Sequence, residues 1–177
     1  MGFISFFLVG LLLIALQTTI LRDWVSYLGM PDLVFAYVAF IAFRFSWLPG
    51  LLLVAIMGWI MDVAVSVELG AYLMQYLLVW AALTVVTQQK SIKESVYQVP
   101  LTAGAFFICQ IIGHLFIIVS DPAAEAYWSM EAVARQTMVM AIAIVPCFLF
   151  LNWFYERAQR RRLPSRLVKK PSGNRFR

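Results

Sequence analysis

The sequence predicts an all-α integral membrane protein, a bundle of six transmembrane helices with both termini in the cytoplasm. Hydrophobic residues make up 63% of the 177 residues and charged residues only 13%, whereas soluble domains carry about 25% charged residues. The few charged residues also divide the chain into uncharged stretches, several of them as long as the ~17–25 residues of a spanning helix. We therefore expect one transmembrane domain at residues 1–155 and a short tail at 156–177.

The first expected span covers residues 3–21. It begins close to the start of the sequence, and no lysine or arginine precedes it. No small-residue cleavage site follows it, and the apolar run exceeds the ~7–15 residues typical of a signal peptide. We expect this segment to be retained as a transmembrane helix.

The second expected span, at residues 31–47, contains the shortest uncharged stretch. Its uncharged part, Leu33–Phe43, covers only about half of a ~30 Å hydrocarbon core. It can cross if Asp32 and Arg44 lie in opposite headgroup layers and the helix continues to Trp47. Asp32 is expected to cap this helix as well as to mark its outer boundary. If it does not cross, the chain has five spans, with the N-terminus outside and the C-terminus still in the cytoplasm.

The remaining spans are expected at residues 49–67, 69–89, 98–120 and 133–155. Pro49 and Gly50 mark a turn before the third span, and the few residues around Glu68 join the third and fourth spans as a tight hairpin. A polar segment at 88–96 and an acidic segment at 120–130 separate the last spans.

The distribution of basic residues sets the orientation. With six spans, twelve of the fourteen lysines and arginines fall on the cytoplasmic side, as the positive-inside rule requires. Prolines and a glycine in the tail argue against a long helix there, so we expect it to be disordered and to bind anionic lipid or a partner. No folded nucleic-acid-binding module accompanies this charge. The basic residues expected to face lipid or a partner are Arg157, Arg160, Arg161, Arg162, Arg166, Lys169 and Lys170.

Polar side chains recur at one expected depth, in the outer half of the bilayer. Asp62 is the acid inside an otherwise apolar run, so it should face protein, pair with another group or be protonated. His114 is the nearest candidate partner by depth. A ligand-binding or signal-transmitting site and a simple helix-locking hydrogen bond both fit this pattern. The expected layer comprises Gln17, Asp62, Gln75, Gln110, His114 and Gln136.

Enzymatic chemistry has little support in the sequence. The chain has no hydrolase, zinc-protease or phosphate-loop motif and no cysteine–histidine cluster. Cys109 and Cys147 lie in apolar runs and are expected to serve as packing residues. We predict no catalytic residue, no metal site and no cofactor.

Short motifs in the first half resemble the rod-shape-determining protein MreD family. They are Pro31-Asp32-Leu33-Val34, then Gly58 and Asp62, then Leu69-Gly70-Ala71-Tyr72. Glu68 departs from the resemblance, because a small or uncharged polar residue is expected there. By this resemblance the family-motif residues are Pro31, Asp32, Gly58, Asp62, Gly70 and Tyr72.

The resemblance implies a non-enzymatic, multi-pass protein of the bacterial inner membrane. It would scaffold or regulate the complex for lateral peptidoglycan elongation, with MreC, MreB, RodA and a class B penicillin-binding protein as partners. Proteins similar to MreD also resemble the S components of energy-coupling-factor transporters. A vitamin-binding transporter subunit is therefore the alternative, and the polar layer would be its site.

Overall fold

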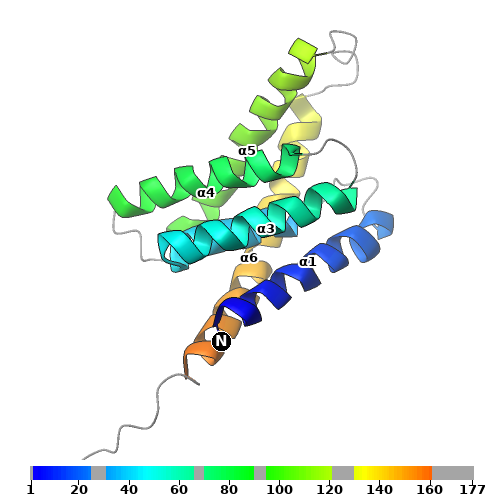
Figure 1. The fold of residues 1–177 in the computed structure, drawn as a ribbon. Helices are drawn as coiled ribbons and strands as arrows, with labels where there is room; N and C mark the ends of the chain where they lie inside the picture. The colour runs from blue at the N-terminus through cyan, green and yellow to red at the C-terminus, as the bar shows by residue number, and fades with distance from the viewer. Residues whose placement is uncertain (1, 25–30, 66–69, 90–94, 121–129, 161–177) are drawn as a thin grey trace, which may run out of the picture.

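The computed structural model describes residues 2–24, 31–65, 70–89, 95–120 and 130–160, and these residues form six helices and no strand. This confirms the predicted all-helical class. Figure 1 shows α1, α3 and α4 running side by side, while α6 runs more steeply behind them. The helices are α1 (Gly2–Trp24), α2 (Leu33–Arg44), α3 (Trp47–Val65), α4 (Ala71–Gln89), α5 (Ser95–Ser120) and α6 (Met130–Arg160).

Three helices of the described part are long and apolar enough to cross a membrane. Their spanning segments are Phe3–Ile20, Trp47–Val65 and Met130–Ala158. The other three carry shorter apolar segments, Leu33–Arg44, Ala71–Thr87 and Tyr97–Gly113. The difference lies in the apolar segments and not in helix length, because α4 has 19 residues and α5 has 26, against 19 in α3.

The shortest helix, α2, occupies the centre of the bundle. Every residue from Val34 to Ala42 is buried, and among the described helices α2 is the one that contacts all the others. Its twelve residues extend over about 18 Å. A helix that is apolar on all sides lies either in a protein core or in lipid. Helix α2 lies in the core, because the other helices enclose it.

The outer faces of the surrounding helices are apolar. On α1 an exposed stripe repeats every four residues, so it lies on one side of the helix. The exposed residues of α3 and α6 form similar stripes. An apolar surface of this extent is typical of a protein surrounded by lipid. The α1 stripe consists of Ile4, Leu8, Leu12, Leu16 and Ile20.

The start of α1 and the end of α6 lie at the same end of the bundle. The ring of Phe6, near the start of α1, contacts Phe154 and Tyr155, near the end of α6, at centroid distances of 5.5 and 5.9 Å. Phe6 also contacts Phe45, just after α2. In Figure 1 the N-terminus accordingly lies beside the orange end of α6.

Two helix boundaries differ from the expected ones: the end of α2, at Arg44, and the start of α3, before Pro49. The second helix does not continue to residue 47: it ends at Arg44, and Phe45 is extended at φ −100° and ψ 151°. The turn expected at Pro49 is instead the first turn of α3, where proline costs nothing because that turn needs no backbone N–H. Pro100 also lies within a helix: α5 begins five residues before it, at Ser95.

Helices α3 and α4 approach each other closely at Gly58. A Cβ atom built there would lie 2.8 Å from the Cα atom of Leu73, a backbone atom that cannot move without moving α4. Glycine is therefore required by the helix–helix distance.

Gly58→Ala should lower the free energy of unfolding by about 1–3 kcal/mol, because the two helices must separate. Gly104→Ala is the matched control, since a Cβ there meets nothing within 4 Å and alanine is the better helix former. Reversible unfolding in mixed detergent micelles, followed by circular dichroism, measures both. Equal stability of the two variants would contradict the tight α3–α4 contact.

Candidate functional site

The N-terminal end of α2 is held by a side chain that precedes it. Asp32 is the N-cap residue, with φ −85° and ψ 92°, and its Oδ1 accepts a hydrogen bond of 2.9 Å from the backbone N–H of Phe35. The first N–H groups of a helix have no partner inside the helix, and this end of α2 is surrounded by protein. The cap therefore satisfies a backbone donor with little access to water.

Two further helices contribute side chains to the same carboxylate. Gln17 of α1 donates from Nε2 to Asp32 Oδ1 at 3.3 Å and accepts from the backbone N–H of Val34 at 3.2 Å. The Tyr76 hydroxyl of α4 lies 3.0 and 3.1 Å from the two oxygens of Asp32. Asp32 thereby ties the start of α2 to both α1 and α4.

Asp62, near the end of α3, caps a different helix. Its two carboxylate oxygens accept from the backbone N–H groups of Tyr72 and Leu73, at 2.8 and 3.2 Å. These amides belong to the first turn of α4, which follows Gly70 with its positive φ of 100°. Asp62 supplies the capping oxygens from ten residues away in sequence.

The two caps adjoin each other through a pair of tyrosines. The rings of Tyr72 and Tyr76 lie 5.8 Å apart, with Tyr76 bonded to Asp32 and the Tyr72 amide bonded to Asp62. We call Gln17, Asp32, Asp62, Tyr72 and Tyr76 the capping cluster. Both carboxylates accept hydrogen bonds from amide or hydroxyl donors, and they lie at the positive ends of α2 and α4.

The predicted site residues divide into those in or beside this cluster and those away from it. Pro31 is buried next to Asp32, and Gly58 is buried one turn before Asp62. Gln75, Gln110 and Gln136 are partly buried, and among the described residues no hydrogen bond joins them to the cluster. The His114 side chain lies outside the described residues, so its predicted pairing with Asp62 is not tested.

Most of the predicted basic tail also lies outside the described residues. Arg157 is described, and its guanidinium carbon lies 5.4 Å from the centre of the Trp153 ring, a cation–π contact.

Sequence reasoning underestimated Asp32 and missed Tyr76. Asp32 was expected to cap the second helix and to mark its membrane boundary; the cap is confirmed, and three helices also converge on this residue. An aspartate three residues before a buried amide is a capping signal that the sequence does carry. Tyr76 offers no comparable signal, because its partner is 44 residues away.

A second polar group lies at the opposite end of α2. Arg44 donates from Nη2 to Asn152 Oδ1 at 3.1 Å, and Asn152 Nδ2 donates to Glu156 Oε1 at 3.0 Å. Gln98 and Thr102 of α5 are also buried. The predicted layer had placed the buried polar residues in one half of the bundle, and these additional residues lie in the other half.

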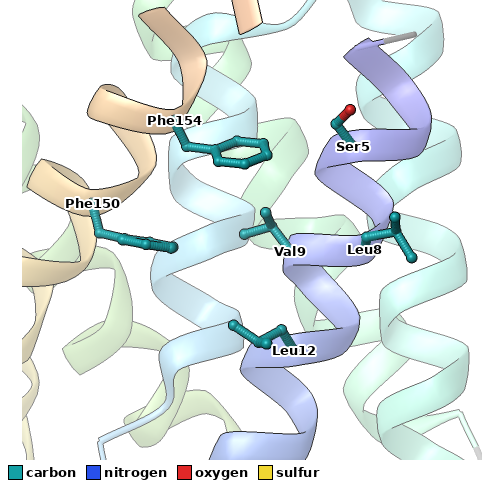
Figure 2. Close-up of a pocket in the computed structure, with 6 residues that line it drawn as sticks. All are labelled: Ser5, Leu8, Val9, Leu12, Phe150 and Phe154. Atoms are coloured by element: carbon teal, nitrogen blue, oxygen red, sulfur yellow. The ribbon is translucent and has the colours of Figure 1, made fainter. Parts of the chain in front are cut away.

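An open apolar groove separates α1 from α6. Figure 2 shows the rings of Phe150 and Phe154 pointing from α6 toward Val9 and Leu12 of α1. Ser5 and Leu8 complete its lining. This groove is suited to an apolar occupant.

The described residues form an all-helical bundle with three helices able to cross a membrane and two carboxylates, buried Asp62 and partly buried Asp32, that cap helices. They contain no group of three or more histidine, cysteine, aspartate or glutamate side chains placed to hold a metal ion. Searches of protein-family models, curated proteins and solved structures found no match to this chain.

Proposed function

We propose that this chain is a non-enzymatic, multi-pass component of the bacterial inner membrane that scaffolds the cell-shape complex for lateral peptidoglycan elongation. The observation that carries the proposal is the convergence of the MreD-like residues. Asp32, Asp62 and Tyr72 belong to the capping cluster, and Pro31, Gly58 and Gly70 adjoin it. Motifs separated by up to 41 positions in the sequence thus serve one structural purpose.

The proposed topology has six crossings with both termini in the cytoplasm. Its support is the contact of Phe6 with Phe154 and Tyr155, because an even number of crossings returns the chain to the side where it began. The basic tail favours the cytoplasmic side for that end. The short helix α2 is enclosed by the other helices, so its neighbours and its caps, rather than lipid, satisfy its ends.

The scaffolding surface that we propose is the exposed side of α1 and its groove with α6. Leu8 and Leu12 are 58% exposed and lie beside Phe150, which is 42% exposed. An apolar membrane helix of a partner such as MreC would bury these side chains. MreB, RodA and the penicillin-binding protein would join through the larger complex.

Co-purification with MreC from the same organism tests the proposal. The two proteins are co-expressed and solubilised, and MreC is expected to remain bound to the wild-type chain and to be lost from Leu12→Trp, which fills the groove. Leu78→Trp is the matched control, because Leu78 is 67% exposed on α4, away from the groove. If MreC does not co-purify with the wild-type chain, the proposed function is wrong. A small molecule found in the intact protein by native mass spectrometry would favour the vitamin-binding alternative.

A further inference from the structure

Arg44 is the last residue of α2, and it lies inside the bundle rather than at its rim. Helix α6 continues for eight residues beyond Asn152, the partner of Arg44, which corresponds to about 12 Å. Arg44 is half-buried and close to Phe43, whose ring contacts Phe148. The cation is therefore set back from the end of the bundle.

The hydrogen-bonding capacity of Arg44 is mostly unused. A guanidinium group has five N–H donors, and the hydrogen bond found in the described part of the chain is the one to Asn152. Arg44 Nε is buried and has no acceptor there. Glu156, the nearest acid in this network, bonds to Asn152 rather than to Arg44.

Other polar groups lie at the same level of the bundle without neutralising this charge. Gln98 lies near the start of α5, the helix whose Phe106 ring contacts Phe35 of α2 at a centroid distance of 5.1 Å. Gln98 is buried at 4% exposure. Thr84 Oγ1 of α4 is a second buried polar atom without a partner in the described part of the chain. Neither residue carries a negative charge.

We propose that Arg44 binds a phosphate group, supplied by an anionic phospholipid of the leaflet on the side of the basic tail. This inference rests on the membrane setting of the proposed function but not on its partners. A guanidinium within a membrane requires an acceptor, and phosphate matches its planar donors better than other anions of the bilayer surface. The apolar surface of Trp153, exposed on α6 directly after Asn152, offers contact for an acyl chain next to the headgroup.

Lipid retention measured by native mass spectrometry tests the site. The purified protein is mixed with phosphatidylglycerol or phosphatidylcholine. The wild type is expected to retain phosphatidylglycerol about tenfold more strongly, as expected for a charge-assisted hydrogen bond. Arg44→Gln should remove this preference, because glutamine can still reach Asn152 but carries no charge. Arg135→Gln is the matched control: it removes one exposed arginine that has no assigned lipid contact and should keep the preference.

A second experiment distinguishes a lipid headgroup from free phosphate. A further variant shows whether a loss of binding is caused by misfolding. Inorganic phosphate added to lipid-free protein should leave the thermal unfolding temperature unchanged. A shift that Arg44→Gln abolishes would keep the phosphate site but identify a soluble ligand. Arg44→Lys, which keeps the charge but not the planar donors, should fold and retain an intermediate preference. Equal lipid retention and equal phosphate response in the wild type and Arg44→Gln would overturn the proposal, and so would an identical loss in Arg135→Gln.

Discussion

Asp32→Leu should lower the free energy of unfolding by about 3–5 kcal/mol, the largest effect that we expect from a single substitution in this chain. The substitution leaves three donors without their acceptor: the Phe35 N–H, the Gln17 amide and the Tyr76 hydroxyl. Each unsatisfied buried donor costs about 1–3 kcal/mol. Reversible unfolding in mixed micelles measures the loss.

Two milder variants show how much of the lost stability comes from each hydrogen bond of Asp32. Asp32→Asn keeps one carbonyl oxygen for the Phe35 N–H and should lose less than half as much stability. Tyr76→Phe removes a single hydroxyl and should cost about 1 kcal/mol. If Asp32→Leu were no less stable than Tyr76→Phe, the cap of α2 would not be a major source of stability.

Asp62→Leu should lower the free energy of unfolding by about 2–4 kcal/mol. It removes the acceptors of the Tyr72 and Leu73 N–H groups in the first turn of α4. Asp62→Asn should retain part of this stability, because its carbonyl oxygen can accept one of the two bonds. Gln75→Leu is the matched polar-to-apolar control on α4 and should change stability by less than about 0.5 kcal/mol.

The same variant also separates a structural role of Asp62 from a functional one. Under the proposed function, cells that lack this chain lose rod shape, so rod shape is scored in such cells carrying the variant, alongside the stability and the membrane insertion of the variant. Loss of rod shape with stability reduced as predicted would mean that Asp62 acts through the position of α4. Loss of rod shape with unchanged stability would contradict the capping account and indicate a direct contact with a partner.

The Asp32 and Asp62 substitutions test why a strongly apolar chain carries two aspartates inside its bundle. Helix α2 is about 18 Å long, shorter than a ~30 Å hydrocarbon core. Val34 and Phe35, in its first turn, are buried in protein, so the protein itself must supply acceptors for their amides. A carboxylate can accept several hydrogen bonds at once, which explains why Asp32 receives donors from α1, α2 and α4.

The sequence by itself determined the all-helical class and the approximate position of every helix. These properties depend on local composition: runs of apolar residues, and breaks marked by charge, proline and glycine. The same local signal misplaced the end of α2 and the start of α3. It could not detect that Phe45 becomes extended so that its ring can contact Phe6 of α1.

The tertiary structure decided the partners of the polar residues. Depth in a predicted span suggested His114 for Asp62, but the described partners of Asp62 are the Tyr72 and Leu73 amides of α4. Asp32 meets Tyr76 across 44 positions of sequence and Gln17 across 15. Hydropathy averages over a window of about 19 residues and carries no direction around the helix axis. Only the packing of helices around α2 specifies which side chains face one another and which backbone donors they must satisfy.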